Sequence, residues 1–412
     1  MEQTLTTAER AILNRIASEG RVTHMRRARL LLLRDQEIPV RAIASQVNLS
    51  RTRVYHWLNA FQEKRMGVFP PDLLAAAAQA GPLPAEETAA APVEVEPRRQ
   101  KAPGILPGDP MSEAGRKVLR FHFERMLQHD PGTRRGKDIE ELHDMRVATR
   151  RMRAAFGVFA PYFDPDVLRP FLKGLRRTGR ALGRVRDLDV FMEKAQRYLA
   201  EQPEEERPDL GPLLAEWQEQ RAAAREQMLA FLDGKHYQRF VPEFGDFLHT
   251  EGAGALPPPK DRPTPQQVYQ AAPILIYSRY DVVRGYESVI GHAPLETLHA
   301  LRIDCKRWRY TLEFFQEVLG PEAKDVIKEV VTVQDHLGHL NDADVATRLL
   351  IGFLEQWSRQ AGRERVNISG VARYLVAKQD ELHGLLDSFP EVWQHFNRPE
   401  TRRQLALAVS TL

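Results

Sequence analysis

Four residues with cationic or imidazole side chains, His143, Arg146, Arg150 and Arg153, are separated by three, four and three positions. In an α-helix with about 3.6 residues per turn, this spacing places all four side chains on one face. Guanidinium groups bind phosphate and carboxylate oxygens through paired hydrogen bonds, and a neighbouring imidazole adds a further donor. The spacing therefore predicts a one-sided cationic surface that suits an anionic ligand.

The same pattern occurs a second time, 156 positions later, as His299, Arg302, Lys306 and Arg309. We call the first set stripe one and the second set stripe two. Like charges at these spacings repel one another by about 0.2–0.5 kcal/mol per pair. A solvated helix face has no reason to keep the same residue types in the same phase twice, so we interpret the stripes as anion-binding surfaces.

Further cations accompany the stripes. Three of them, Arg176, Arg180 and Arg184, step by four and form a second one-sided ridge. Two stripes from duplicated copies would line a groove, which suits a long polyanion better than one small phosphate. The predicted ligands outside the stripes are Arg151, Arg307, Lys173, Arg176, Arg177, Arg180 and Arg184.

An alternative explanation is that intramolecular salt bridges neutralise the stripes. Four acidic residues follow the stripes in the sequence and could act as partners. They are Asp187, Asp189, Asp342 and Asp344.

A duplicated chain must position these residues. Besides the stripes, residues 182–190 match residues 337–345 at an offset of 155, and both segments begin with Leu-Gly. Two ordered blocks at nearly one offset predict an internal duplication. Prolines between 257 and 265 separate the copies, so we expect repeat one over 111–250 and repeat two over 265–412.

Apolar residues recur at three- and four-residue steps almost throughout, and alternating strand patterns are scarce. The fold class is therefore predicted to be all-α, with room for about four helices in each repeat. Residues 70–110 contain nine prolines and are predicted to be a Pro/Ala-rich linker. Residues 1–69 precede this linker as a separate domain.

The formal net charge is only +3, which excludes a uniformly basic surface. Along the chain, however, the net charge is +6 over 1–69, +8 over 143–186 and +3 over 299–309, with acidic segments between. The single cysteine, Cys305, excludes an intrachain disulfide. We see neither a secretory leader nor a membrane-spanning run, so we expect a cytoplasmic protein without membrane contact.

Catalytic interpretations find weaker support. The pair His143 and Asp144 resembles the start of a metal-dependent phosphohydrolase site, to which His122, His129 and Asp187 could contribute. The second copy has Ala300 in place of the aspartate, and arginines repel a divalent metal. Cys305 lies beside Lys306, but repeat one has no thiol there, so a buried small residue is favoured. No phosphate-binding glycine loop is present, and we expect neither catalysis, a metal nor a cofactor.

The paired blocks resemble the CHAD domain, the conserved-histidine α-helical domain. His143 to Phe159 with Leu182 to Val190 form its first signature, and His299 to Phe315 with Leu337 to Val345 form its second. The resemblance covers about 111–412. It implies two four-helix bundles related by a pseudo-two-fold axis, and inorganic polyphosphate bound along a basic central groove through the motif's His, Arg and Lys positions. Association with polyphosphate granules or the nucleoid would follow. Many relatives carry a triphosphatase domain, whose alternating acidic and basic strands are not visible here.

Residues 23–65 are predicted to form three helices, near 24–35, 40–47 and 50–65. Their apolar spacing predicts a small helix-turn-helix core made of Ala44, Val47, Leu49, Val54, Leu58 and Phe61. The stretch VRAIASQVNLSRTRVYHWLNAF resembles homeodomain-like helix-turn-helix domains of the transposase-associated type. The resemblance implies that the third helix enters the major groove of duplex DNA, while Trp57 packs inside. A protein-interaction module and a nucleic-acid-binding transcription regulator remain alternatives. The candidate DNA contacts are Arg51, Arg53, Tyr55 and His56.

Overall fold

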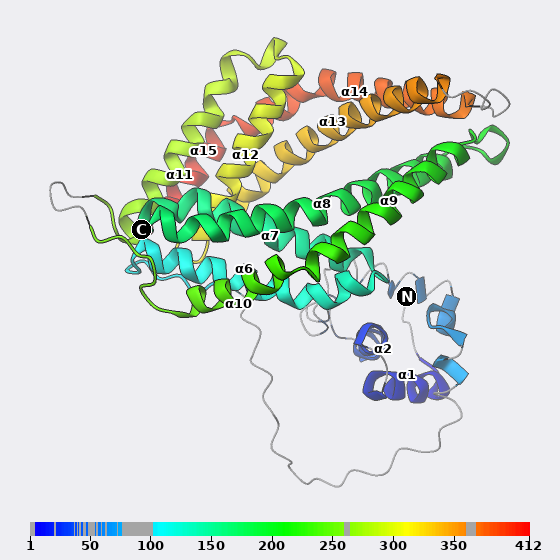
Figure 1. The fold of residues 1–412 in the computed structure, drawn as a ribbon, viewed down its shortest axis with the longest axis horizontal. Coiled ribbons are helices and arrows are strands. Elements are labelled where there is room, and N and C mark those ends of the chain that lie inside the picture. The colour runs from blue at the N-terminus through cyan, green and yellow to red at the C-terminus, as the bar shows by residue number, and fades with distance from the viewer. Residues whose placement is uncertain are drawn as a thin grey trace, which may run out of the picture. The chain divides into compact units, whose positions relative to one another are not determined.

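The computed structural model describes residues 5–19, 22–36, 64–71, 73–75, 102–258, 264–359 and 368–412, together with single positions between 38 and 61. The chain divides into two compact units, Met1–Pro97 and Arg98–Leu412 (Figure 1). Within the described ranges, regular structure is helical apart from two isolated β-bridges. The predicted all-α fold class is confirmed.

The N-terminal unit contains one helix that the sequence did not predict. Helix α1 (Thr7–Glu19) precedes α2 (Val22–Asp35), and a short 3₁₀ helix, η1, covers Arg65–Val68. Leu13 and Ile16 of α1 are buried in the core of this unit, and Arg10 forms an ion pair of 2.6 Å with Asp35. A fourth helical segment therefore supports the predicted three, because its apolar face completes their core.

The predicted helix-turn-helix core is buried where it is described. Val47, Val54, Leu58 and Phe61 all have exposed fractions of 6% or less. The guanidinium of Arg27 lies 3.6 Å from the ring centroid of Trp57, which confirms that this ring is packed. Two further predicted core residues, Ala44 and Leu49, lie outside the described residues.

Five α-helices form the described part of each repeat in the second unit. Repeat one contains α6 (Met111–Arg135), α7 (Ile139–Phe159), α8 (Pro165–Glu201), α9 (Gly211–Leu232) and α10 (Lys235–His249). Repeat two contains α11 (Val268–Arg284), α12 (Leu295–Phe315), α13 (Ala323–Ser358), α14 (Ser369–Phe396) and α15 (Pro399–Val409). Short 3₁₀ helices lie at Ala160–Tyr162, Glu204–Glu206, Gly285–Ser288 and Ile290–His292.

The fourth element expected in each repeat is divided in two. Asp233 and Gly234 separate α9 from α10, and Asn397 and Arg398 separate α14 from α15. Gly234 is a poor helix former, and Pro399 occupies the first turn of α15, where its missing N–H costs nothing. The same break at the same place in both copies accounts for five helices where four were expected.

Equivalent residues of the two repeats contact each other. Phe159 of α7 and Phe315 of α12 occupy the same position at the offset of 156, and their ring centroids are 5.7 Å apart. Gly115 of α6 permits this packing, because a Cβ atom there would lie 2.7 Å from Phe159. Contact between a residue and its own copy is typical of a two-fold relation. The phenylalanine pair belongs to one apolar core that both repeats share.

A second apolar contact joins the repeats further along their long helices. Leu213 and Trp217 of α9 share a buried cluster with Leu350 of α13 and Tyr374 of α14. A Cβ atom on Gly370 would lie 2.2 Å from the carbonyl oxygen of Asp209. The two backbone segments therefore approach each other as closely as only glycine permits. The repeats are thus joined at two separate places, the Phe159–Phe315 contact and this distal cluster.

Both ends of the predicted linker pack against the neighbouring units. Phe69 is buried in the N-terminal core, and Leu73 and Leu74 pack against it. At the other end, Ile105 is buried in the shared core of the repeats, and the N–H of Gly104 donates to Glu317. The segment from 102 to 110 thus forms part of the second unit.

Candidate polyanion-binding site

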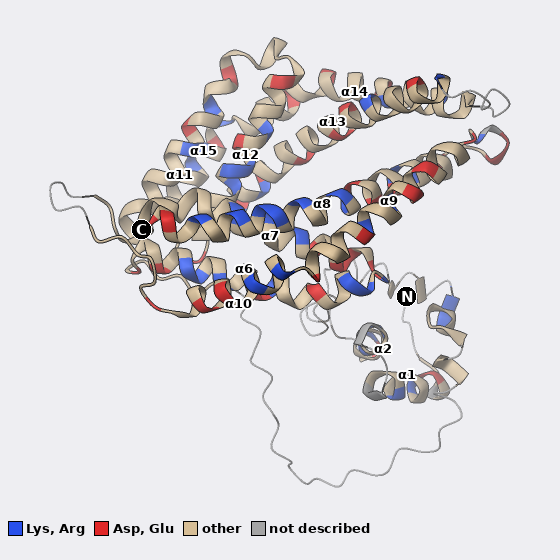
Figure 2. Ribbon diagram, viewed as in Figure 1, with Lys and Arg blue, Asp and Glu red and all other residues tan. Residues whose placement is uncertain are grey.

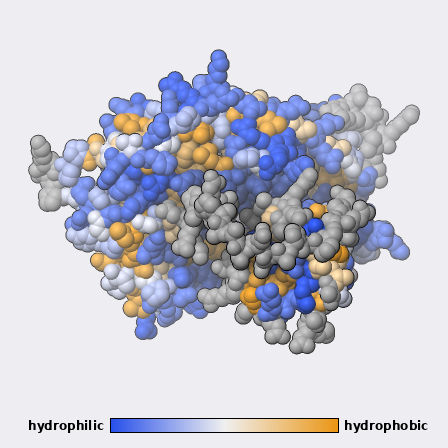
Figure 3. All heavy atoms as spheres, turned by 90° about the horizontal axis from the view of Figure 1, so that it is seen from below, coloured by the Kyte–Doolittle hydropathy of each residue, from blue (hydrophilic) through white to orange (hydrophobic). Residues whose placement is uncertain are grey.

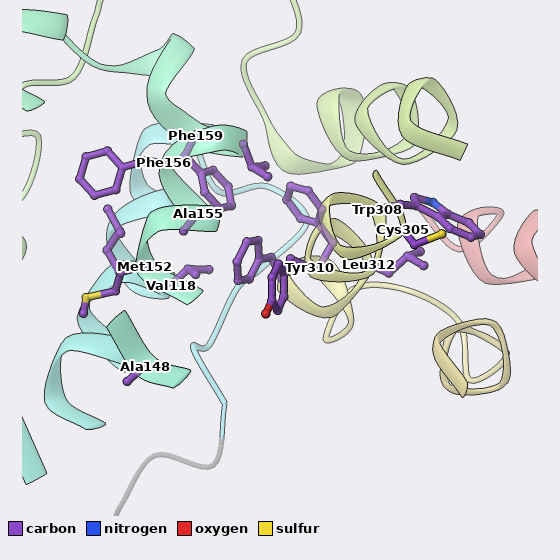
Figure 4. Packing of buried hydrophobic residues seen from close by; sticks show 14 of the residues in the cluster. Val118, Ala148, Met152, Ala155, Phe156, Phe159, Cys305, Trp308, Tyr310 and Leu312 are labelled. Atoms are coloured by element: carbon purple, nitrogen blue, oxygen red, sulfur yellow. The ribbon is translucent and has the colours of Figure 1, made fainter. Parts of the chain in front are cut away.

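The two stripes lie on α7 and α12, whose opposite faces are apolar. Met145, Ala148 and Met152 bury the back of α7, and Cys305 and Trp308 bury the back of α12. Figure 4 shows Cys305 and Trp308 pointing into repeat two, while Tyr310 points toward α7. Alternation of apolar and cationic residues at helical spacing therefore fixes which face each stripe presents.

The stripes meet at Arg150 and Lys306, which are equivalent residues of the two repeats. Arg150 lies close enough for its charge to lower the pKa of Lys306 and that of Arg302. Figure 2 shows the Lys and Arg positions of α7, α8 and α12 gathered where these helices face one another. Cations from both copies thus converge on one region, which we call the cationic centre.

Lys306 has the most strongly shifted charge in the cationic centre. Its burial lowers its pKa to about 7, and the positive charges of Arg302, Arg150 and Arg309 act in the same direction. Asp342 opposes this shift but does not cancel it. Burial first, and then the neighbouring positive charges, disfavour the charged form of this lysine, and an anion beside it would favour that form.

A glycine lies under the first arginine of each stripe. A Cβ atom on Gly183 of α8 would lie 3.7 Å from Nε of Arg146, and one on Gly338 of α13 would lie 4.0 Å from Nε of Arg302. Both glycines belong to the Leu-Gly blocks at 182–190 and 337–345. These blocks indicated the duplication, but the sequence did not show that their glycines contact the stripe arginines. Each guanidinium therefore lies close to the backbone of the neighbouring helix at its glycine.

We expect substitutions of Gly183 to separate stability from binding. Gly183→Ala adds ordinary van der Waals contact and should stabilise α8 by up to about 1 kcal/mol, because alanine favours helix. Gly183→Leu should displace Arg146 and weaken anion binding about fivefold with little change in stability. Chemical unfolding and anion-binding titrations of both variants test this; equal affinities for both would contradict the role assigned to the glycine.

The histidines contact the second blocks differently in the two repeats. His299 Nδ1 lies 2.9 Å from the amide oxygen of Asn341. In repeat one the position of Asn341 is occupied by Arg186, whose charge, after burial, contributes to lowering the pKa of His143. Each histidine therefore interacts with the same helix position of its own copy. Neither Arg186 nor Asn341 was among the predicted site residues.

The acidic residues offered as salt-bridge partners mostly bind other cations. Asp187 does reach stripe one, with an ion pair of 2.9 Å to Arg146. The other three pair with cations outside both stripes: Asp189 with Arg221, Asp342 with Lys194 and Asp344 with Arg348. These four acids therefore leave Arg150 and Lys306 without a direct ion pair to any of them.

Arg151 and Arg307 lie off the stripes, because adjacent helical residues point about 100° apart. Arg151 crosses to repeat two and forms an ion pair of 2.9 Å with Glu313, beside Arg309 at 3.6 Å. Arg307 instead pairs with Asp304 on its own helix at 2.9 Å. Glu313, which the sequence analysis did not single out, therefore holds one arginine from each repeat.

Removing the charge of Glu313 should destabilise the contact between the repeats. Its side chain is only 13% exposed, and Glu313→Gln leaves Arg151 and Arg309 close together without a counter-charge. Breaking a largely buried ion pair in this way costs about 3 kcal/mol. Urea unfolding measures the loss, and Arg151→Gln should cost less because Glu313 keeps Arg309; equal losses would argue against the shared role.

The three ridge arginines of α8 and the two other cations predicted on that helix lie in three different surroundings. Arg176 and Arg180 lie near Arg153 of stripe one and, together with its burial, lower its pKa. Arg184 donates to the side chain of Gln227 on α9 at 3.1 Å. Lys173 and Arg177 face α10, where they line a separate cavity. The structure thus brings part of the ridge to stripe one and places the rest elsewhere.

The residues nominated for a metal site do not gather at one point, although His129 Nε2 lies 3.9 Å from Asp144 Oδ2. His122 is buried against Phe121 and Phe314, and desolvation lowers its pKa to about 3. His129 binds Glu141 at 2.8 Å, while Asp187 pairs with Arg146. In the described part of the chain, no three His, Cys, Asp or Glu side chains gather in a way that could hold a metal.

Cys305 is fully buried, as the sequence analysis favoured. Burial raises the pKa of its thiol to about 12, and the neighbouring Asp304 acts in the same direction. A thiol that stays protonated at neutral pH is a poor nucleophile.

The surface drawn in Figure 3 is predominantly hydrophilic, with hydrophobic residues in small separate patches. No helix in the described ranges combines the length and apolarity that crossing a membrane requires. The four candidate DNA contacts, Arg51, Arg53, Tyr55 and His56, lie outside the described residues.

Comparison with protein families identifies both units. The CHAD domain model matches residues 117–351, which include α7, α8, α12 and most of α13. The homeodomain-like domain model matches residues 21–66 of the N-terminal unit.

Solved structures similar to the chain include a CHAD domain from the plant Ricinus communis, with 24% identity and a TM-score of 0.56. The similarity covers 70% of this chain and 93% of the plant chain. PptA from Streptomyces chartreusis has 15% identity and a TM-score of 0.53, over 69% of this chain and all of that chain. At these identities, the likeness concerns the fold.

Two curated relatives come from Mycobacterium tuberculosis, the uncharacterized proteins MT2285 of strain CDC 1551 / Oshkosh and Rv2226 of strain H37Rv. Each is 27% identical over 263 residues, which is 61% of this chain and 48% of the relative. The chain thus spans about half the length of these relatives. Because the domain model covers more than half of the sequence and contains both stripes, the chain belongs to the CHAD domain family.

Proposed function

We propose that the second unit binds inorganic polyphosphate through the cationic centre. The observation that carries the proposal is the approach of Arg150 to Arg302 and Lys306, which joins the stripes of both repeats. Burial and mutual repulsion of these cations oppose their charging, and an anion placed among them would remove that cost. Arginine also matches the tetrahedral oxygens of phosphate through two parallel hydrogen bonds.

A polymer fits this arrangement better than a single phosphate. Stripe one continues through Arg153 to Arg176 and Arg180 of α8, so cations extend beyond the centre along repeat one. A chain with one negative charge per unit can contact the centre and this extension together. Each further phosphate adds favourable contacts without another full loss of translational freedom.

The decisive comparison uses ligands of matched charge. The full chain is titrated with long-chain polyphosphate, single-stranded RNA and duplex DNA at two salt concentrations. We expect polyphosphate to bind more tightly than RNA at both, with an affinity that falls steeply as salt rises. If RNA binds equally well, the cationic centre binds polyanions in general, and the proposed preference for polyphosphate is wrong. Phosphate release measured with Mg²⁺ or Mn²⁺ tests the alternative of hydrolysis.

We infer a second function for the N-terminal unit, the binding of duplex DNA. Two observations favour it: the homeodomain-like match over 21–66 and the net charge of +6 over 1–69. An Arg51→Ala/Arg53→Ala variant should lose DNA affinity but keep polyphosphate affinity. Unchanged DNA binding by this variant would direct attention to a protein partner instead.

A further inference from the structure

Repeat one contains a cavity of about 300 Å³ between α8 and α10, and none of the stripe residues lines it. Lys173 and Arg177 of α8 line one wall, and His236 and Arg239 of α10 line the other. The volume is at the lower end of the range for small-molecule pockets, about 300–1,000 Å³.

The interior of the cavity is aromatic. Its apolar lining includes the rings of Phe171, Phe231, Tyr237 and Phe240. The hydroxyl of Tyr237 donates to Asp130 at 2.8 Å, which fixes this ring in position. Four rings from three helices thus surround a space whose entrance is cationic, a combination that neither stripe offers.

A single glycine opens this space. A Cβ atom on Gly174 would lie 2.4 Å from the ring of Phe240, so only glycine lets that ring pack against α8. The offset of 155 along α8 and α13 makes Glu329 the equivalent residue in repeat two. Glu329 instead lies 3.4 Å from His395 and 3.9 Å from Arg398, which ties α13 to the junction of α14 and α15.

The α8 side of the cavity is only partly kept in repeat two. Lys173 corresponds to Lys328, whereas Arg177 corresponds to Thr332 and Phe171 to Val326. Among the lining residues, three permanent cations face one carboxylate, Glu243, which accepts a hydrogen bond of 2.6 Å from Nε of Arg239. Repeat two therefore keeps one of the two α8 cations, whereas Arg177 and Phe171 are specific to repeat one.

We propose that this cavity binds a small organic phosphate with a planar ring, the chemistry of a nucleoside phosphate. The ring would stack on the aromatic lining, and the phosphate would accept hydrogen bonds from Lys173 and Arg177 at the entrance. A purely inorganic phosphate would contact the cations but not the aromatic lining. This site is separate from the cationic centre and does not depend on polyphosphate binding there.

The test titrates the full chain with ADP by calorimetry, without divalent cations. ADP should bind at one site, and Lys173→Glu/Arg177→Glu should weaken it at least tenfold. Lys324→Glu/Lys328→Glu is the matched control, because it reverses two exposed lysines four residues apart on α13. This control and an Arg150→Glu/Lys306→Glu variant should bind ADP like the unmodified chain.

Three outcomes would overturn the proposal. The first is that ADP does not bind at millimolar concentration. The second is that ADP binding is lost in the Arg150→Glu/Lys306→Glu variant but kept in the cavity variant, which would place ADP at the cationic centre. The third is that inorganic tripolyphosphate displaces ADP from the Arg150→Glu/Lys306→Glu variant with an affinity equal to that of ADP. This result would show that the rings contribute nothing to binding. Weak competition there supports the site.

Discussion

An Arg150→Glu/Lys306→Glu variant is expected to lose at least about 100-fold in affinity for long-chain polyphosphate. Each charge-assisted hydrogen bond to phosphate contributes about 1.5–3 kcal/mol, so the loss of two is worth about 3–6 kcal/mol. The two glutamates would additionally repel the polymer at the cationic centre. Filter binding or calorimetry at fixed salt measures the change.

The matched control reverses two exposed arginines elsewhere in repeat two, Arg373→Glu/Arg403→Glu. It alters the net charge by the same amount, so it reports how much of the loss is a general electrostatic effect. Thermal unfolding checks the fold, and the double variant at the cationic centre should be no less stable than the original, because repulsion among its cations is relieved. Equal polyphosphate affinity in both double variants would refute the assigned site.

The affinity for polyphosphate should also fall by about tenfold or more between pH 7 and pH 9. Lys306 has a pKa of about 7 in the free protein, and phosphate beside it would raise that pKa. Binding then takes up a proton above pH 7, and the affinity decreases by up to about tenfold per pH unit. Below about pH 6, Lys306 is already charged and this dependence should vanish.

The free protein should show the opposite trend in stability. An unfolded lysine has a pKa of 10.5, so the unfolded chain binds more protons than the folded one between about pH 7 and pH 10.5. The contribution of Lys306 to stability therefore rises with pH across this window. The pKa of His143 is lowered from 6.5, so that side chain stays neutral here and does not interfere.

Lys306→Arg distinguishes this proton linkage from other effects of pH. Arginine remains charged at all these pH values, and repeat one already has arginine at the equivalent position, Arg150. The variant should bind polyphosphate with little change between pH 7 and pH 9. Calorimetry in buffers of different ionisation enthalpy counts the protons taken up; no uptake by the unmodified chain at pH 8 would disprove the linkage.

The helical fold class and the duplication could be predicted because both depend on the spacing of apolar and cationic residues along the sequence. The stripes and the Leu-Gly blocks repeat at nearly one offset, the apolar residues recur at three- and four-residue steps, and the CHAD resemblance rests on the stripes and blocks. The extra helix α1 and the breaks at Asp233–Gly234 and Asn397–Arg398 were missed. Their formation depends on which apolar face finds a core to cover, a tertiary property that one helix's sequence does not contain.

For the site, the phase of each stripe was predictable but the distribution of its neighbours was not. Helical geometry already separates Arg151 from Arg150 by about 100°. Contacts between helices that are distant in sequence decide the rest. They bring Arg151 to Glu313 of the other repeat and place Lys173 and Arg177 opposite α10. The shifted pKa of Lys306 likewise arises from burial against the opposite copy.

The two apolar contacts between the repeats give the cationic centre a mechanical property. Phe159 and Phe315 join the helices on one side of Arg150 and Lys306, and the cluster around Trp217 and Tyr374 joins them further along, beyond Asp187. Clamped at both places, the cations cannot relieve their repulsion by moving apart. The free protein therefore retains the electrostatic repulsion among these cations, and a bound polyanion would neutralise it without any movement of the two repeats.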